Sequence, residues 1–303
     1  MLVMIGLAPM TTTYDPAHPL YLDEADVRGE MTRVFGVCNG CRACVDLCAS
    51  FPTLFQMLER HADQDPGRLT PAQQDRVVDE CVHCKRCADD CPYIGTGDAA
   101  HLSGPSDLGV DVPRLMLRVR AMQHDGDITS WRSRAATQVV ARADFVGKVA
   151  TKAPALATRI LRADPPFANR RFSRWFKDRS RPAAPSSAHQ VGPVTIFPTC
   201  LVEYRDTDIG TSLVAEYESR GLECSLSRAE CCGAPWLHAG DIKRFRKVAL
   251  RNVQQLAVEV RRGTDVVVLQ PTCARVIQHD YVDHVDGPDA ALVAARTFDA
   301  AKY

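Results

Sequence analysis

The chain has 303 residues, 46% of them apolar, and carries 37 basic and 37 acidic side chains. This length and apolar content are enough for two folded domains, and the balanced charge is not that of a nucleic-acid-binding protein. The sequence contains no apolar run of about 18 residues that could span a membrane. Its apolar opening segment lacks the basic flank of a signal peptide, so we expect a cytoplasmic protein.

Thirteen cysteines fall into two groups, Cys38 to Cys91 and Cys200 to Cys273, with a long cysteine-free stretch between them. So many cysteines in a chain of this size indicate metal or cluster binding rather than packing. The gap between the groups is the natural domain boundary. We expect an N-terminal arm at residues 1–30, a dicluster domain at 31–110, a basic amphipathic linker at 111–190 and a cysteine-rich domain at 191–303.

The first domain is expected to be mainly helical. Residues 31–60 and 71–90 have helical spacing of apolar residues, and Thr70 followed by Pro71 is typical of a helix start. Another helix is predicted around Leu115 to Met122, and a flexible tether at residues 180–187.

The linker is strongly basic between Val140 and Pro182, with eleven Lys or Arg against three Asp. Apolar residues from Phe145 to Leu161 fall on one helical side, interrupted at Pro154, and Phe172, Trp175 and Phe176 follow. Positive charge beside aromatic anchors suits an anionic membrane surface. Docking on a partner protein and simple solvation are the alternatives.

The C-terminal part has a different pattern. Residues 194–197 and 265–269 are short, β-branched, fully apolar runs, as buried parallel strands are. Residues 208–220 and 241–262, which lie between these runs, predict amphipathic helices. The overall expectation is an α+β multidomain protein, with a helical ferredoxin-like dicluster domain followed by an α/β domain.

A C-x2-C-x2-C-x3-C motif occurs twice, at residues 38–48 and 81–91. In such repeats three cysteines hold one 4Fe-4S cluster, and the fourth reaches the neighbouring cluster. Structural zinc is the alternative, but zinc gives no reason for the same four offsets to recur. The predicted ligands are Cys38, Cys41, Cys44 and Cys91 for cluster 1, and Cys81, Cys84, Cys87 and Cys48 for cluster 2.

Four cysteines of the second group follow predicted strands or lie in turns, where open α/β sheets place ligand sites. They are Cys200, Cys231, Cys232 and Cys273. Gly233 after the adjacent pair would let the backbone turn closely about a bound group. Reduced thiols in a packing role are the alternative for these four residues, and the favoured interpretation for Cys224.

This second set resembles the CCG domain of heterodisulfide reductase and its relatives. The order of both sets is similar to the iron–sulfur C subunit of anaerobic glycerol-3-phosphate dehydrogenase and to related iron–sulfur proteins of lactate and glycolate oxidation. The resemblance is carried by Cys81-Val-His-Cys-Lys-Arg-Cys, Cys231-Cys-Gly-Ala-Pro and Pro271-Thr-Cys-Ala followed by Asp280-Tyr281. It implies a further cluster or metal at the four cysteines of the second set.

Two departures from that family stand out. Cys273 is followed by Ala-Arg-Val where relatives often have C-x2-C, and relatives normally carry a second CCG repeat, which would begin where this chain stops at Tyr303. The C-terminal domain is therefore expected to be one half of the usual tandem repeat, in an apparently truncated form.

The sequence favours an electron-transfer subunit with no catalytic residue of its own. Electrons would pass from a flavoprotein dehydrogenase subunit, acting on glycerol 3-phosphate or a 2-hydroxy acid, through two 4Fe-4S clusters toward quinone or a thiol acceptor. We expect no nucleic-acid partner. We do expect peripheral contact with the cytoplasmic face of the membrane. The alternatives are a catalytic reductase that uses the CCG cysteines, and a cluster-bearing regulatory protein.

Overall fold

A computed structural model describes residues 14–89, 91–94, 108–126, 131–179, 193–229 and 231–303. The chain divides into two compact units. The first comprises Met1–Thr129 with His238–Asp241, and the second comprises Ser130–Leu237 with Ile242–Tyr303. Within the described residues, no helix has the length and apolar character needed to cross a membrane.

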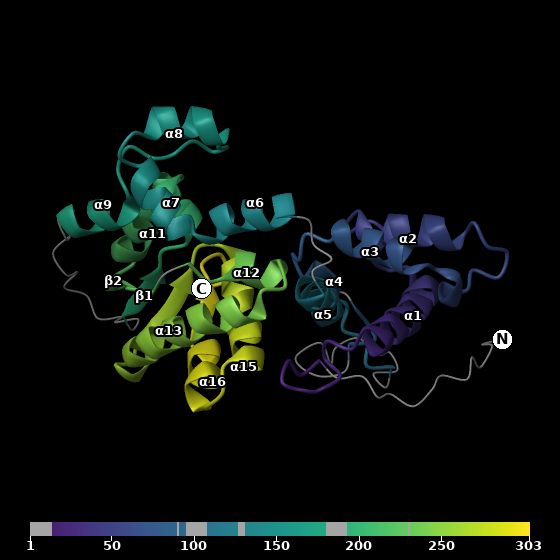
Figure 1. The fold of residues 1–303 in the computed structure, drawn as a ribbon. Coiled ribbons are helices and arrows are strands. Elements are labelled where there is room, and N and C mark those ends of the chain that lie inside the picture. Colours follow the sequence, from purple (N-terminus) through teal and green to yellow (C-terminus); the bar gives the residue numbers. More distant parts are fainter. Residues whose placement is uncertain (1–13, 90, 95–107, 127–130, 180–192, 230) are drawn as a thin grey trace. The chain divides into compact units, whose positions relative to one another are not determined.

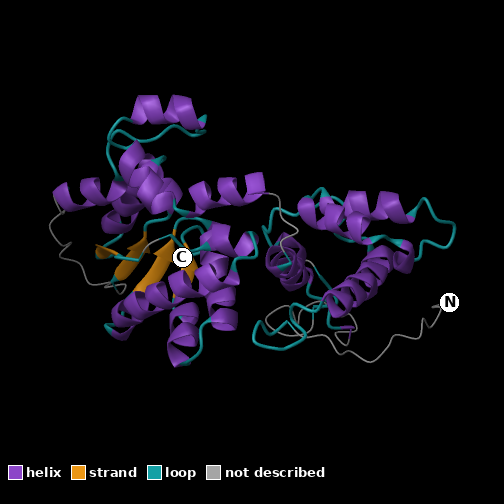
Figure 2. Cartoon of the chain, viewed as in Figure 1, coloured by secondary structure: helices purple, strands orange, loops and turns teal. Residues whose placement is uncertain are grey.

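The first unit is helical, as predicted (Figure 2). Its helices begin at local capping signals: Asp23 accepts a hydrogen bond from the Asp26 N–H, and Thr70 and Gln73 form a reciprocal capping box. The elements are α1 (Glu24–Cys41), α2 (Ser50–Leu58), η1 (Pro66–Arg68), α3 (Pro71–Asp79), α4 (Arg86–Asp89) and α5 (Val112–Asp125).

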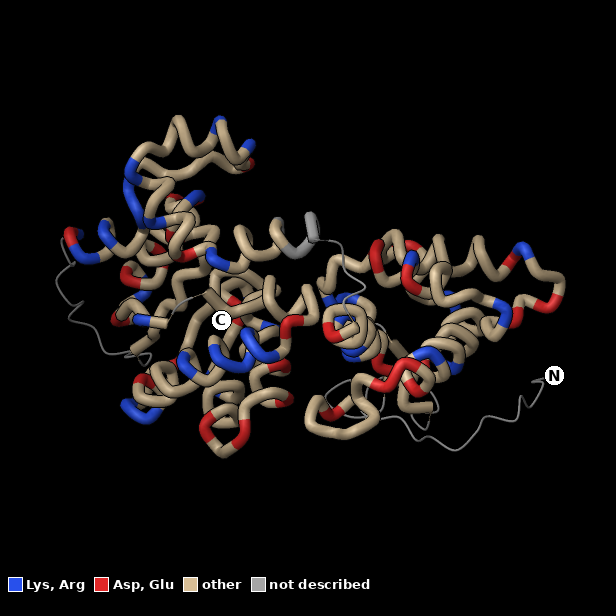
Figure 3. The backbone as a smooth tube through the Cα atoms, viewed as in Figure 1, with Lys and Arg blue, Asp and Glu red and all other residues tan. Residues whose placement is uncertain are grey.

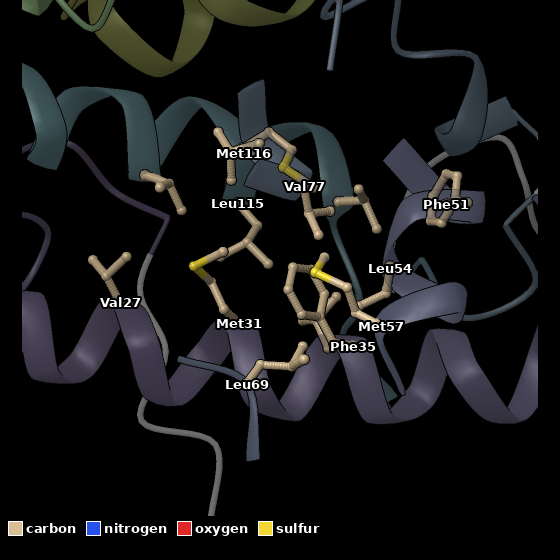
Figure 4. Packing of buried hydrophobic residues seen from close by; sticks show 14 of the residues in the cluster. Val27, Met31, Phe35, Phe51, Leu54, Met57, Leu69, Val77, Leu115 and Met116 are labelled. Atoms are coloured by element: carbon tan, nitrogen blue, oxygen red, sulfur yellow. The ribbon is translucent and has the colours of Figure 1, made fainter. Parts of the chain in front are cut away.

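Helices α1, α2, α3 and α5 enclose an apolar core. Met31 and Phe35 of α1 point toward Leu54, Val77 and Leu115 of the other three helices (Figure 4). Most of the repeat cysteines pack against the edge of this core. The core therefore holds the helix ends from which the cysteine loops start.

A buried arginine ties the N-terminal segment to α5. The fully buried Arg118 guanidinium donates hydrogen bonds to the carbonyls of Tyr21, 2.8 Å, and Leu20, 2.5 Å, and pairs with Asp26 at 2.5 Å. A buried charge is tolerated only when it is paired in this way. Residues 14–30 are thus tied to the helical unit, and α1 begins inside the segment expected as an arm.

The second unit contains the sheet. Its elements are α6 (Trp131–Ala141), α7 (Ala143–Ala150), α8 (Pro154–Leu161), α9 (Phe172–Asp178), β1 (Val194–Phe197), α10 (Cys200–Tyr204), α11 (Thr207–Ser219), β2 (Cys224–Leu226), α12 (Ala234–His238), α13 (Ile242–Arg261), β3 (Asp265–Val268), α14 (Pro271–Arg275), a π-helical turn η3 (Val276–Asp280), α15 (Tyr281–His284), α16 (Pro288–Ala295) and β4 (Thr297–Asp299).

The four strands form one parallel sheet in the order β2-β1-β3-β4. Val194 of β1 is paired with Cys224 on one side and Asp265 on the other. All four residues of β1 are buried, as the apolar run predicted. Because every strand runs the same way, their carboxyl ends share one edge, and the chain order reverses between β1 and β3, where such sheets place ligand sites.

Helices cover both faces of this sheet. Helices α13, α15 and α16 pack together on one face, and α9, α10 and α11 on the other (Figure 1). Phe172 and Phe176 of α9 belong to the core on this second face, with at most 7% of their surface exposed. The interpretation of these two rings as membrane anchors is therefore wrong, because they fill the space between α9 and the sheet.

The segment expected as a linker, residues 111–190, is divided between the two units. Helix α5 contributes Leu115, Met116 and Val119 to the core of the first unit, whereas α7 contacts α10 in the second. At Gly147 of α7, a Cβ atom would lie 2.3 Å from the ring of Tyr204, so only glycine permits this approach. The predicted tether at 180–187 lies outside the described residues.

The capping box gives a test of the first unit. Replacing Thr70 with Ala removes the acceptor for the Gln73 N–H, 3.3 Å away, and should lower the free energy of unfolding by about 1 kcal/mol. Urea unfolding followed by circular dichroism measures this change. The matched Thr70→Ser variant keeps a hydroxyl and should lie close to the wild type; equal losses in both variants would contradict the capping role.

Candidate functional site

The eight cysteines of the tandem repeat lie at helix ends in the first unit. Cys38 and Cys41 belong to the last turn of α1, and Cys44 and Cys48 follow before α2. In the second copy, Cys81 follows α3, Cys87 lies in α4, and Cys84 and Cys91 flank that short helix. Each repeat thus starts from a helix anchored in the core.

The backbone bends sharply at the same point of both repeats. Arg42 has a φ of 57° and Lys85 a φ of 62°, and each lies directly after the second cysteine of its motif. Left-handed backbone is uncommon for residues with a Cβ and is retained where the surroundings require it. Both repeats therefore have the same left-handed residue between their second and third cysteines.

The first group of thiols contains the cysteine predicted to cross over from the second repeat. Burial raises the pKa of Cys38 to about 12, with smaller contributions from the neighbouring thiols of Cys91, Cys44 and Cys41. Burial also raises the pKa of Cys91, with Cys41 as its contributing thiol neighbour. Cys91 therefore lies with the first repeat, although it ends the second.

The second group contains three cysteines of the second repeat and Cys48, the last cysteine of the first repeat. Burial raises the pKa of Cys81, and the thiols of Cys48 and Cys84 add to the effect. Burial raises the pKa of Cys87 as well, and its thiol neighbours are Cys81, Cys44, Cys48 and Cys84. Cys44 of the first group is thus also close to Cys87, and the two groups adjoin. This is the grouping expected from the spacing, and the role of these residues as ligands is proposed below.

The surroundings fit iron–sulfur clusters. A cavity bordered by the four cysteines of the first group is closed by Phe51, Phe55, Val110 and Val112, and all thirteen cysteines are free thiols. Soft sulfur ligands in an apolar shell suit iron–sulfur chemistry. Within the described ranges, no three His, Cys, Asp or Glu side chains are placed to hold a single metal ion; a cluster instead binds each thiolate to a different iron atom.

Two arginines border the first group. The Arg42 guanidinium lies 4.8 Å from the centre of the Phe55 ring and pairs with Glu59 at 2.6 Å. Arg33 pairs with the buried Glu30 at 2.7 Å and lowers the pKa of Cys38, partly offsetting its burial. Arg33 was not predicted from the sequence; its place on α1 ahead of Cys38 was the available signal.

In the second unit the four predicted cysteines also come together. Cys200 is the first residue of α10 after β1, and Cys273 lies in α14 after β3. The Sγ atoms of Cys232 and Cys273 are 3.1 Å apart, and the side chain of Cys231 makes hydrogen bonds with those of Cys200 and Cys232. We call this continuous set of Cys200, Cys231, Cys232 and Cys273 the thiol row.

Hydrogen bonds from two helices fix the backbone of the thiol row. The Asn252 side-chain amide on α13 donates to the Cys231 carbonyl, 3.1 Å, and to the Tyr281 hydroxyl, 2.9 Å. That hydroxyl donates to the Cys232 carbonyl, 2.9 Å. Burial raises the pKa of Tyr281, so it remains a donor. Gly233, with a φ of 86°, then turns the chain away.

A carboxylate from the basic stretch also reaches the row. Asp144 on α7 accepts the Cys231 N–H at 2.9 Å and the Tyr204 hydroxyl at 3.1 Å. The hydrogen bond with Cys231, burial and then the charges of Cys231 and Asp144 raise the pKa of Cys200. Sequence analysis missed Asp144; the signal was that it is the only acidic residue between Val140 and Asp164.

Comparison with known families gives matches in both units. The family model for a 4Fe-4S dicluster domain matches residues 37–94, and that for a cysteine-rich domain, CCG, matches residues 194–278. These ranges contain the eight repeat cysteines and the thiol row, respectively. They confirm the predicted fold class, a ferredoxin-type dicluster domain followed by a CCG domain.

Three curated proteins illustrate the similarity. The C subunit of anaerobic glycerol-3-phosphate dehydrogenase of Escherichia coli K12 is 27% identical over 257 residues, which cover 68% of this chain and 63% of the relative. The lactate utilization protein A of Bacillus cereus B4264 is 27% identical over 117 residues, covering 36% of this chain and 46% of the relative. The citrate utilization protein B of Escherichia coli is 31% identical over 91 residues, covering 30% of this chain and 19% of the relative.

This chain thus spans less than two thirds of the length of the glycerol-3-phosphate dehydrogenase subunit that it matches. No solved structure matches it.

The crossed grouping can be tested by paired substitutions. Cys38→Ser with Cys91→Ser should remove one cluster, because both residues lie in the first group, whereas Cys38→Ser with Cys48→Ser should affect both clusters. Iron content of anaerobically purified protein measures this: relative to the wild type, the first variant should lose about four atoms per chain and the second should lose more. If the two double variants reverse this order, the crossed assignment is wrong.

Proposed function

We propose that this chain, which joins a 4Fe-4S dicluster domain to a CCG cysteine-rich domain and so carries iron–sulfur clusters, is the electron-transfer subunit of an oxidoreductase complex. The clusters supply one-electron transfer. The protein residues hold them, shield them from water and connect them to partners.

The gathering of the eight repeat thiols into two adjoining groups is the observation that carries this proposal. Cys38, Cys41, Cys44 and Cys91 would hold cluster 1, and Cys81, Cys84, Cys87 and Cys48 cluster 2. Because Cys44 is an electrostatic neighbour of Cys87, the two clusters would be adjacent. Adjacent clusters suit a relay of single electrons better than two isolated metal sites would.

The thiol row would carry the next site on the route. Its four side chains are linked one to the next and lie at the carboxyl edge of the sheet, so they suit a further iron–sulfur cluster. Cys224 is set apart from the row: it lies on β2, and burial and the Glu218 carboxylate raise its pKa to about 12. We assign it to packing.

The partner in this proposal is a flavoprotein dehydrogenase subunit. One relative is named a subunit of anaerobic glycerol-3-phosphate dehydrogenase and another a lactate utilization protein, and both names point to small hydroxylated substrates. Electrons would leave this chain toward a quinone or a thiol acceptor.

A catalytic reductase is the second candidate, favoured by the 3.1 Å approach of Cys232 and Cys273. Two thiols at that separation could reduce a disulfide directly. A regulatory protein without turnover is the third, and no contact in the described residues favours it over the other two.

Exchanging both members of the adjacent pair separates these candidates. Cys231→Ser with Cys232→Ser should leave the visible absorption of the two repeat clusters intact but slow reoxidation of the reduced protein by a soluble naphthoquinone at least about tenfold, or roughly 1.4 kcal/mol of barrier. Stopped-flow absorption measures the rate. Cys224→Ser, which lies outside the row, is the control.

Unchanged reoxidation in the double variant would contradict a route through the thiol row. If the double variant is reoxidised by the quinone at the normal rate but no longer reduces a disulfide, the catalytic reductase is favoured.

We further propose that the protein lies at the cytoplasmic face of a membrane, in contact with anionic lipid. A hollow of about 710 Å³ is lined by five cations, with Asp178 as its only acid; these are Lys148, Lys152, Arg170, Arg171 and Arg174. Figure 3 marks the Lys and Arg positions along the backbone. The neighbouring α7 and α8 expose Phe145 and Ile160 by more than two thirds of their surface. Cationic and apolar groups side by side suit the lipid interface.

Vesicle flotation tests this contact. The protein should float with anionic vesicles at low salt and be released as salt rises, because each surface cation contributes about 1 kcal/mol near anionic lipid. Reversing Arg170, Arg171 and Arg174 to Glu should abolish flotation. Reversing Arg220, Arg246 and Arg262, which are exposed but line no part of the hollow, should not; equal loss in both triple variants would contradict a defined membrane face.

A further inference from the structure

A second pocket opens directly beside the thiol row. Its volume is about 330 Å³, within the range of small-molecule sites. Cys231 and Gly233 contribute to one side, α6 and α7 form another through residues 141–148, and Trp236, Val248 and Arg251 complete it. It shares only Lys148 with the cationic hollow described above.

The charge of this pocket is positive. Three cations line it, Arg142, Lys148 and Arg251, against the single carboxylate of Asp144. Both oxygen atoms of Asp144 already accept hydrogen bonds, from the Cys231 N–H and the Tyr204 hydroxyl. The carboxylate is therefore directed at the protein, and a ligand would meet a cationic rim, which selects anions.

The remaining wall is apolar and aromatic. Trp236 is 7% exposed and held under the Arg244 guanidinium, 5.0 Å from the ring centre, so it forms a fixed surface. Phe145 is 69% exposed and can close over a ligand without loss of core packing. Gly233 allows close packing behind the pocket, because a Cβ there would lie 3.0 Å from the buried Phe245 ring.

We propose that this pocket binds a small organic anion with a flat apolar body, its acidic group at the Arg142, Lys148 and Arg251 rim and its ring between Phe145 and Trp236. Cations on one side and aromatic rings on the other recognise both parts of such a molecule. The bound molecule would lie against the backbone of Cys231. The inference concerns binding alone and does not require the electron route proposed above.

Isothermal titration of the full, cluster-containing chain under anaerobic conditions tests this site with a matched pair of probes. 2-Naphthoate has the flat ring and the anionic group, and 2-naphthamide has the same ring without charge. We expect naphthoate to bind with one site per chain and the amide at least about tenfold more weakly, because hydrogen bonds to charged groups are the stronger ones.

Three variants place the binding in this pocket. Arg251→Gln should weaken naphthoate about tenfold and leave the amide unchanged, whereas Phe145→Ala should weaken both probes. Arg246→Gln is the control, because it removes a charge from the same helix, α13. Arg246 pairs with Asp286 and does not line the pocket. It should bind both probes as the wild type does.

Equal binding of the two probes, or equal effects of Arg251→Gln and Arg246→Gln, would overturn the proposal. Because each titration reads binding rather than electron transfer, this result is separate from the fate of the proposed function. If the chain binds naphthoate but transfers no electrons, the binding-site proposal stands and the electron-transfer proposal fails.

Discussion

The first unit depends on one constraint. Each proposed cluster needs the first three cysteines of one repeat and the last cysteine of the other repeat at the same place. In the proposed ligand sets Cys91 joins Cys38, and Cys48 joins Cys81, so each cluster would need a cysteine from both repeats. The apolar core between α1, α2, α3 and α5 meets this constraint by fixing the helix ends from which both loops start. Left-handed residues, Arg42 and Lys85, occupy the same place in both loops, directly after the second cysteine. Because these residues store strain, the packed helices must hold them.

The second unit solves a similar problem with a sheet. Parallel strands bring β1 and β3 to one edge, and Cys200 and Cys273 follow them directly. The adjacent Cys231 and Cys232 are instead held by long-range hydrogen bonds from Asn252, Tyr281 and Asp144. Asp144 also makes α7 part of the surroundings of the thiol row, so the basic stretch is linked physically to the site rather than only to the surface.

Local patterns in the sequence predicted much of this arrangement. The buried strands at 194–197 and 265–268 and the helix start at Pro71 were clear because an apolar run and a capping motif are contained within a few residues. Strands β2 and β4 are harder to recognise, since three residues carry no periodicity and are extended only through their neighbours. Asp144 was missed and Phe172 was misjudged for the same reason: their partners, Cys231 and the sheet, are distant in the chain.

The central claim is that two adjacent 4Fe-4S clusters lie in the first unit. Electron paramagnetic resonance of the anaerobically purified, dithionite-reduced chain tests it most directly. The account predicts at least about two spins per chain, with a spectrum broadened by coupling between neighbouring clusters. A protein that contains zinc and no iron, or reduced clusters whose spectra are narrow and independent, would contradict it.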